Sequence, residues 1–298
     1  MGPRPSAEAR SFKVDRRRFT VFGLGAGDPY FRQIGGRFES KFQAVCARAL
    51  RPGGVAIDVG ANIGVTSLIM SAFVGDHGRV VAIEPGPRIF ELLGDNVEAN
   101  QARCVTPLRC AVSASAGQMG FEENSAYGHL MAEGGAEATV EVRTLDGIVD
   151  DLGLDRLDFV KIDTEGFEPQ VLAGGRDILQ RLRPMVYLEL NAWTLLAYGR
   201  SDPLTFLRDL VRLYPHVLRV RRWGRTLRLE QMTGEPDDLA LILLRDNVCY
   251  SDGFNDLLLI PDDAALARFK DIVSPPEPPH GRGLRRLIHA LGLRLRRA

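Results

Sequence analysis

The sequence contains 298 residues, of which 45% are hydrophobic and 26% charged, and its formal net charge at pH 7 is zero. These proportions are typical of a globular protein with a sizeable core. The two ends of 18 residues carry six basic residues each, so the body between them is net acidic, which argues against a nucleic-acid-binding core.

The cysteines and the apolar runs indicate the cellular compartment and whether the chain crosses a membrane. The four cysteines form no CxxC pair, and their scatter favours reduced thiols in a cytoplasmic protein. The first residues lack the apolar centre of a secretory signal. The apolar run LALILL at 239–244 is far shorter than the ~20 residues that span a bilayer. We therefore expect no transmembrane segment.

Composition divides the chain into four parts. Residues 1–18 are polar and basic and are expected to form a flexible arm. Residues 19–50 end in the helical pattern SKFQAVCARAL and are expected to form a helical segment or lid. After the breaker RPGG, residues 51–262 form the predicted main domain. Residues 263–298 are expected to form a Pro-rich linker and a basic amphipathic tail that docks a partner or an anionic surface.

Within the main domain, short apolar runs alternate with segments of helical spacing. A glycine-rich excursion at 118–142 and the residues around Trp223-Gly224 are each expected to form a hairpin, and LALILLR at 239–245 a final strand. The pattern predicts an α/β fold with a mostly parallel sheet, helices on both faces and an antiparallel edge. The strands expected before the second hairpin are 55–60, 78–85, 105–113, 157–163 and 183–190.

The motif AIDVGANIGVTS at 56–67 marks a ligand-binding turn. A strand carries Asp58 near its end, turns through Gly60 and Asn62, and enters a helix after Gly64. Glycines allow a tight turn and the close approach of a ligand to bare backbone. Glu84 ends the next strand, where open α/β sheets place a carboxylate that binds ribose hydroxyls.

Two classes of cofactor compete for this turn. A nicotinamide enzyme is expected to have GxGxxG, which seats a pyrophosphate at the helix N-terminus. Here the second glycine position is Asn62, and the carboxylate of Asp58 just upstream would repel a pyrophosphate. A ligand that carries ammonium and sulfonium groups suits that carboxylate. The electrostatics therefore favour S-adenosylmethionine over NAD.

Several of these segments resemble the FkbM family of class I, Rossmann-like methyltransferases that depend on S-adenosylmethionine. The resemblance runs from about residue 36 to 190 and rests on DVGANIG, Glu84-Pro85, TLDGIV and above all DFVKIDTEGFEPQVLAGG. Thr164 stands where the family usually has Val. The resemblance implies a seven-stranded sheet with an antiparallel last strand. It also implies O-methylation of a hydroxyl on a sugar, glycan or secondary metabolite. Because most of the resemblance falls within the predicted main domain, we interpret 51–262 as a SAM-binding methyltransferase domain.

The resemblance also implies which residues bind the cofactor. The turn would hold the methionine end, Glu84 the ribose hydroxyls, and the end of the third strand would border the adenine. Alternatively, the glycines serve the turn alone and Asp58 caps the following helix. The residues assigned to the cofactor are Asp58, Gly60, Ala61, Asn62, Gly64, Glu84, Pro85, Ala111 and Ser113.

Four charged residues follow one another where the fourth strand ends. Asp163 is expected to position a ligand or to act as the base, and Glu165 on the next turn is the more exposed candidate base. Lys161 precedes the strand end and is expected to form an internal ion pair, because a buried lysine needs a carboxylate. Glu168 precedes Pro169 at a helix start, where a carboxylate complements the helix dipole.

Further residues enter as weaker candidates. Glu189 would join Asp163 and Glu165 if Mg²⁺ were bound through oxygen ligands, but no metal site is favoured because nothing completes a recognisable ligand set. Glu39 from the lid side, His129 in the excursion and Glu189 are candidate substrate contacts. Two other functions remain open: N-methylation on the same fold, and a SAM-binding interaction protein without turnover.

Overall fold

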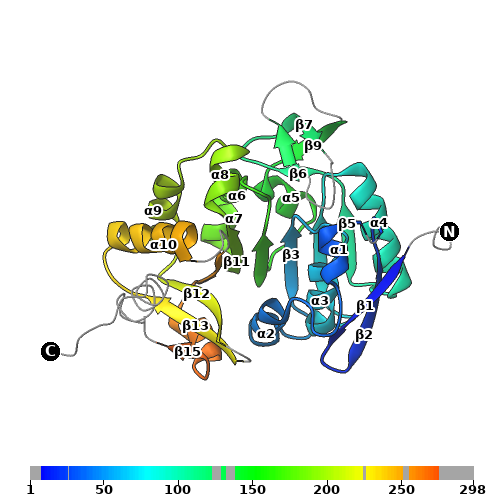
Figure 1. Ribbon diagram of the computed structural model, residues 1–298, viewed down its shortest axis with the longest axis horizontal. Helices are drawn as coiled ribbons and strands as arrows, with labels where there is room; N and C mark the ends of the chain where they lie inside the picture. The colour runs from blue at the N-terminus through cyan, green and yellow to red at the C-terminus, as the bar shows by residue number, and fades with distance from the viewer. Residues whose placement is uncertain are drawn as a thin grey trace, which may run out of the picture.

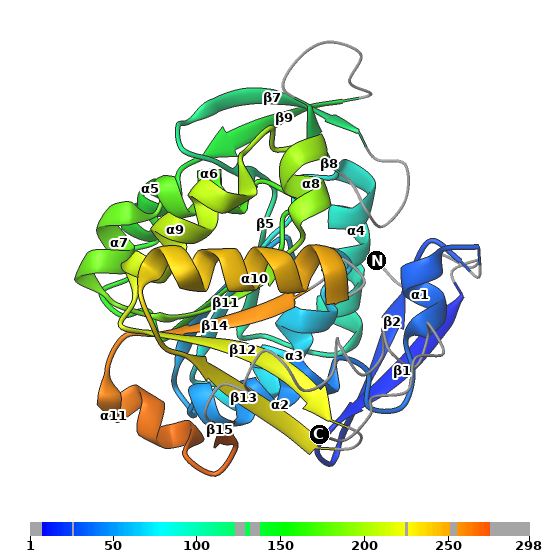
Figure 2. The same cartoon turned by 60° about the vertical axis from the view of Figure 1, so that its left-hand side comes forward.

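The structure is a computed structural model, and it describes residues 8–25, 27–122, 129–131, 138–223, 226–250 and 255–274 (Figures 1 and 2). A nine-stranded sheet in the order β15-β13-β12-β14-β11-β10-β3-β4-β5 forms its centre. The last five strands in this order run parallel. They are β11 (Met185–Leu190), β10 (Phe159–Ile162), β3 (Val55–Val59), β4 (Arg79–Ile83) and β5 (Val105–Leu108).

The other four strands extend the sheet through three antiparallel pairings and one parallel pairing at the edge. Strand β14 (Asn255–Ile260) lies between β11 and β12 (His216–Trp223) and is antiparallel to both. Strand β12 pairs with β13 (Thr226–Met232) in a hairpin, and β15 (Val273–Ser274) forms the edge. The α/β class and the late hairpin are therefore confirmed, whereas the sheet has nine strands instead of the expected seven, and β14 lies inside it.

The strand expected at 239–245 is wrong. This run lies inside α10 (Pro236–Tyr250), whose first turn carries Asp237 and Asp238. Pro at the first position and acids in the first turn favour a helix start, and an apolar run alone does not distinguish a buried strand from a helix. The strand follows the helix instead, as β14, and all six of its residues are buried.

Helices cover both faces of the sheet. Alternate strand residues point to opposite faces, so Ala56 packs into one hydrophobic cluster and Ile57 into the other. The first cluster includes residues of α2 (Ser40–Ala49), α3 (Val65–Val74) and α4 (Pro87–Ala99). The second includes residues of α5 (Leu145–Asp151), α6 (Glu168–Ala173), α7 (Arg176–Arg181), α8 (Ala192–Ala197), α9 (Pro203–Leu213) and α10.

The basic arm expected at 1–18 is a hairpin from residue 9 onward. Strands β1 (Ala9–Val14) and β2 (Arg17–Phe22) pair antiparallel, and alternate side chains such as Phe12 and Val21 are buried. Two asparagines of α4 hold β2: Asn96 accepts from Phe22 N at 2.6 Å and Asn100 from Thr20 N at 2.9 Å. Exposed charged residues alternate with the buried apolar ones, so the overall composition of the segment is polar and did not indicate a strand. Residues 1–7 lie outside the described part.

The glycine-rich excursion forms a second, four-stranded sheet of order β6-β9-β7-β8. Its strands are β6 (Ala111–Val112), β7 (Gly117–Glu122), β8 (His129–Met131) and β9 (Ala138–Arg143). Strands β7 and β9 pair antiparallel, as expected for a hairpin. The strand expected at 105–113 is split into β5 and β6, which belong to different sheets.

The described fold extends past the expected boundary at 262. Helix α11 (Asp263–Leu266) and the 3-10 turn Ala267–Phe269 lead to β15, and the side chain of Phe269 is fully buried. Asp271 pairs with Arg48 of α2 at 2.6 Å. Residues 263–274 therefore belong to the globular part, and the predicted linker and tail from 275 onward lie outside the described residues.

The sequence raised two further questions, whether a helix spans a membrane and whether the cysteines are paired. No helix among the described residues has the length and apolar content needed to cross a bilayer. All four cysteines are free thiols, and three of them are buried.

Candidate functional site

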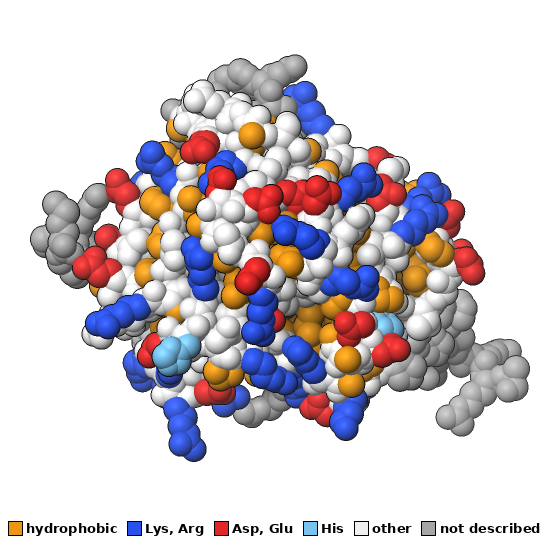
Figure 3. All heavy atoms as spheres, turned by 180° about the vertical axis from the view of Figure 1, so that it is seen from behind, with side chains coloured by type: hydrophobic (Ala, Val, Ile, Leu, Met, Phe, Trp, Pro, Cys, Tyr) orange, Lys and Arg blue, Asp and Glu red, His pale blue; other side chains and the backbone are white. Residues whose placement is uncertain are grey.

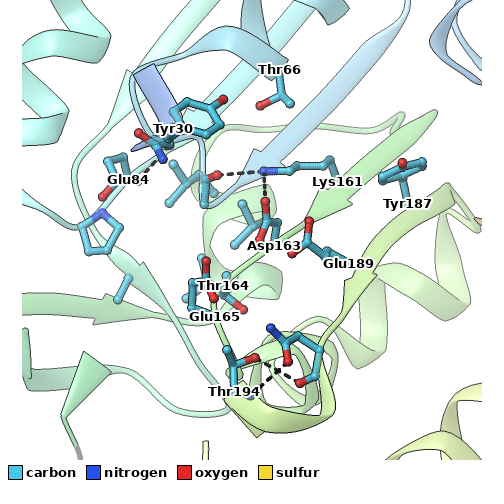
Figure 4. A pocket seen from close by; sticks show the side chains of 18 of the residues that line it. Tyr30, Thr66, Glu84, Lys161, Asp163, Thr164, Glu165, Tyr187, Glu189 and Thr194 are labelled. Atoms are coloured by element: carbon cyan, nitrogen blue, oxygen red, sulfur yellow. Dashed lines mark hydrogen bonds and ion pairs between the residues drawn. The ribbon is translucent and has the colours of Figure 1, made fainter. Parts of the chain in front are cut away.

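A cavity of about 500 Å³ opens at the carboxyl ends of the parallel strands (Figure 4). Gly60 follows β3, Glu84 follows β4 and Asp163 follows β10, and all three line the cavity. Open α/β sheets bind ligands at this edge, and the volume falls within the range of ligand sites, about 300–1,000 Å³. The lid segment contributes as well, through Tyr30 and Glu39 among others.

The loop between β3 and α3 requires glycine at its first position. Gly60 has φ +78°, and a Cβ atom there would lie 1.8 Å from the carbonyl oxygen of Asp163. Gly60 and Asn62 line the cavity. Gly64 packs against Leu93 on the other side of the loop, and Ala61 is buried. Of the four loop residues that the sequence assigned to the cofactor, Gly60 and Asn62 line the cavity, whereas Ala61 and Gly64 shape the loop.

The carboxylate of Glu84 organises the cavity wall next to this loop. Its Oε2 accepts from Asn62 N and its Oε1 from Gly86 N, both at 2.9 Å. The side chain is buried yet lines the cavity, together with Pro85. A carboxylate held by two backbone amides keeps acceptor capacity for ligand hydroxyls.

Asp58 lies beneath the cavity wall. Its side chain is fully buried, and Oδ2 accepts from the hydroxyls of Thr66 at 2.7 Å and Ser67 at 2.6 Å. Oδ1 lies 3.4 Å from Nζ of Lys161. Asp58 thus contacts two hydroxyl side chains in the first turn of α3, but it does not cap the helix, because the N-cap is Gly64 and no side chain accepts a capping hydrogen bond there. It reaches the cavity through Thr66 and Lys161, which line it.

Lys161 forms the internal ion pair that the sequence predicted. Its Nζ lies 3.2 Å from Asp163 Oδ2 and donates to the carbonyl oxygen of Gly60 at 2.8 Å. Burial acts to lower the pKa of Lys161, but the carboxylates of Asp163 and Asp58 outweigh it and raise that pKa above its usual value. The ammonium therefore stays charged and fixes the position of Asp163.

Glu168 stabilises the turn after β10 through hydrogen bonds to its backbone. The buried carboxylate of Glu168 accepts from Thr164 N at 2.9 Å and Gly166 N at 3.2 Å. Its role is thus to fix the turn that precedes its own helix. A Cβ atom on Gly166, which has φ +107°, would lie 2.2 Å from the carbonyl oxygen of Thr194 in α8. Glu165 is presented to the cavity by this tightly packed turn.

Among the described residues, five carboxylates besides Glu84 line the cavity, and three of them have raised pKa values. Burial and the neighbouring Asp163 raise the pKa of Glu165 to about 8. Burial, Asp163 and Asp256 raise the pKa of Glu189 well above its usual value. Burial and Asp256 also raise the pKa of Glu39. Crowded carboxylates of this kind are typical of functional sites.

The acids are not arranged as a metal centre. Within the described ranges, no group of three or more His, Cys, Asp or Glu side chains has the arrangement that holds a metal ion. The set considered for Mg²⁺, Asp163, Glu165 and Glu189, shares the cavity, but Asp163 is paired with Lys161.

The remaining predicted residues lie at the edge of the site. Ala111 lines the cavity, whereas Ser113 is buried behind it, with its N donating to the carbonyl oxygen of Arg143 at 3.0 Å. His129 belongs to β8, but its side chain lies outside the described part of the structure.

Several lining residues escaped the sequence analysis. Tyr187 carried a usable signal, because it lies two residues before Glu189 on the same strand and so on the same face. Asp256 carried none, since the position of β14 in the sheet follows only from the tertiary fold. Figure 4 shows Tyr187 and Glu189 on one side of Lys161, and Glu84 on the other. The lining residues not predicted include Tyr30, Phe42, Thr66, Tyr187, Asn191, Thr194 and Asp256.

Comparison with known proteins gives matches to methyltransferases. Residues 58–208 match the family model described as the methyltransferase FkbM domain. The chain is 31% identical over 137 residues to the hexuronic acid methyltransferase AglP of Haloferax volcanii, covering 45% of this chain and 55% of that protein. It is 29% identical over 153 residues to the methyltransferase sdnD of Sordaria araneosa, covering 40% and 59%.

The chain thus matches somewhat more than half the length of these two relatives. Among solved structures, the methyltransferase FkbM of Methylobacillus flagellatus aligns with 17% identity and a TM-score of 0.43, over 73% of this chain and 50% of that one.

Proposed function

The chain belongs to the methyltransferase FkbM family, and from that premise we propose that it transfers a methyl group to a hydroxyl of a saccharide or a related small polyhydroxy compound. Its methyl donor is S-adenosylmethionine. The observation that carries the proposal is one cavity that joins the glycine loop and Glu84 to the acids after β10. The name of the relative AglP, which refers to a hexuronic acid, supports the saccharide class.

The residues present fit the proposed donor. Gly60 lines the cavity, and the absence of a Cβ lets the loop pack directly against the carbonyl oxygen of Asp163. The acids around the loop suit a ligand with ammonium and sulfonium groups and disfavour a pyrophosphate. We assign the methionine end to Gly60 and Asn62, the ribose hydroxyls to Glu84, and the border of the adenine to Pro85 and Ala111, all of which line the cavity.

Bound at this site, S-adenosylmethionine supplies a methyl group that its sulfonium already activates. The protein must then hold the acceptor hydroxyl in line with that methyl group and remove the hydroxyl proton. We assign the proton to Glu165, because its pKa of about 8 lets it accept a proton near neutral pH and its position on the turn faces the cavity. Asp163, paired with Lys161, positions the ligands instead.

Calorimetry and product analysis test this function. The purified chain should bind S-adenosylhomocysteine and not NAD, and Glu84→Ala should weaken that binding. Incubation with labelled S-adenosylmethionine and a panel of saccharides should yield a methyl ether, identified by the carbon chemical shift of the new methyl group. A methylamine product would assign N-methylation instead. Binding of S-adenosylhomocysteine with no methyl transfer to any acceptor class would favour a binding protein without turnover.

A further inference from the structure

We propose that the acceptor end of the cavity recognises a substrate that carries an ammonium group beside the hydroxyl to be methylated, with amino sugars as the simplest class, and rejects uronates. The inference deepens the proposed function and rests on it. It comes from the charges that line the cavity and from their place relative to the cofactor loop.

The acceptor end carries more negative charge than the protein neutralises. Glu39 before α2, Asp163 and Glu165 after β10, Glu189 in β11 and Asp256 in β14 all line the cavity. Within the described lining, Lys161 is the single Lys or Arg, and it pairs with Asp58 and Asp163.

A second lysine, which does not line the cavity, neutralises another of these five acids. Lys41 of α2 forms an ion pair with Asp256. In the described part of the chain, Glu39, Glu165 and Glu189 have no cationic partner within ion-pair distance. Three carboxylates from three segments therefore face the same space without an ion-pair contact, and the charge of Lys161 nearby offsets only part of their repulsion.

The raised pKa values of these three acids show that their charged forms are destabilised in the cavity. Their pKa values are raised because burial and the repulsion by neighbouring carboxylates, Asp163 among them in each case, disfavour the charged forms. A cation placed among them removes part of that repulsion, so it binds more strongly than a neutral isostere. A carboxylate in the same place adds to the repulsion, and binding of a uronate is correspondingly weakened.

One of these acids, Glu189, lies away from Glu84, which is assigned to the donor. In Figure 4, Glu84 and Glu189 lie on opposite sides of Lys161 and Asp163, and Tyr187 lies beside Glu189. The Tyr187 ring contacts Phe42 edge to face at 5.0 Å between centroids, and both line the cavity. Aromatic walls beside carboxylates suit a sugar ring that bears a cation.

Acids are gathered more closely in the cavity than on the outer face shown in Figure 3. The chain between its two basic ends is net acidic, but that face carries basic and acidic side chains interspersed.

Four methyl glycosides provide the test, of which three differ only in the substituent at C2 and the fourth carries a carboxylate at C6. The full chain, saturated with S-adenosylhomocysteine, is titrated in a calorimeter with the methyl glycosides of glucosamine, N-acetylglucosamine, glucose and glucuronic acid. We expect the glucosaminide to bind at least about tenfold more tightly than the acetylated and neutral glycosides, and the glucuronide most weakly. Binding of the glucosaminide near neutral pH should release protons, measured as a dependence of the heat on the ionisation enthalpy of the buffer.

Matched variants connect the preference to the acids. Glu39→Gln and Glu189→Gln should each reduce the preference for the glucosaminide over the acetylated glycoside several-fold, because each removes a carboxyl group that can release its proton and pair with the bound ammonium. Glu98→Gln, on the exposed surface of α4, is the control and should leave the preference unchanged.

Two results would overturn the proposal. The first is glucosaminide binding that is absent or no tighter than that of the glucuronide. The second is an equal loss of S-adenosylhomocysteine affinity in Glu39→Gln and Glu189→Gln, which would assign the acids to the donor. Binding of S-adenosylhomocysteine by the unmodified chain is measured separately, so either result leaves the test of the methyltransferase function unaffected.

Discussion

The ammonium of Lys161 donates to the carbonyl oxygen of Gly60 at 2.8 Å and so ties the end of β10 to the loop after β3. The same Nζ lies 3.2 Å from Asp163 and 3.4 Å from the buried Asp58. One cation therefore holds the backbone assigned to the donor and a carboxylate that faces the acceptor. The positions of the Gly60 backbone at the donor end and of the Asp163 carboxylate at the acceptor end therefore both depend on Lys161.

Replacement of Lys161 by Met should destabilise the protein by about 3–5 kcal/mol, because Asp58 is left buried without its charged partner. Asp58→Asn combined with Lys161→Met should recover part of that loss. The free energy of unfolding, measured by urea denaturation for both single variants and the double variant, gives the coupling energy. Additive effects would show that the two residues do not depend on each other.

Gly60→Ala should abolish binding of S-adenosylhomocysteine, because the new Cβ would lie 1.8 Å from the carbonyl oxygen of Asp163 and force the loop or β10 to move. Calorimetry measures the loss. Gly94→Ala in α4 is the matched control, since a Cβ there meets nothing within 4 Å. The control should bind normally and be more stable by about 0.5–1 kcal/mol. Normal binding by Gly60→Ala would contradict the loop assignment.

Glu165 should give the reaction a pH dependence. Its pKa of about 8 means that the carboxylate, the form that accepts a proton, increases as the pH rises through 8, so kcat should rise over that interval. Glu165→Gln should lower kcat by about 10²–10⁴-fold and remove this inflection. A pH profile of the initial rate checks both effects. Unchanged turnover in the variant would remove Glu165 as the base.

Glu189→Gln should stabilise the protein at high pH. The pKa of Glu189 is raised in the folded state, so above the unfolded value of about 4.3 the folded protein keeps a proton that the unfolded chain has lost. The free energy of unfolding contributed by Glu189 therefore falls as the pH rises, and glutamine removes that loss.

The expected gain at pH 8, reduced for partial solvent screening, is about 1 kcal/mol, and it should vanish near pH 4. Thermal unfolding at the two pH values measures it. A variant that is less stable than the parent at pH 8 would show that the Glu189 carboxylate is matched by a cation.

The parts of the site that the sequence predicted depend on local spacing. The motif around Gly60 and the stretch from Lys161 to Glu168 each lie where a strand ends, and parallel strand ends meet at one edge of a sheet. The ion pair of Lys161 followed from the cost of burying an unpaired charge, and the structure confirms it.

The parts that could not be predicted depend on pairing between distant segments. Asp256 enters the cavity because β14 inserts between β11 and β12, which no local pattern specifies. The N-terminal hairpin was missed because its exposed Arg and Lys residues outweighed the alternation of buried residues such as Phe12 and Val14. In α10 an apolar run of strand-like length fits a helix equally well.

The position of β14 has a consequence for synthesis. Its neighbours β11 and β12 leave the ribosome first, yet their edges cannot pair with each other across the space that β14 fills. A nascent chain that ends before residue 255 presents two unpaired strand edges and lacks Asp256. The cavity lining is therefore completed and those edges are buried together, when β14 docks, and incomplete chains are exposed to aggregation until then.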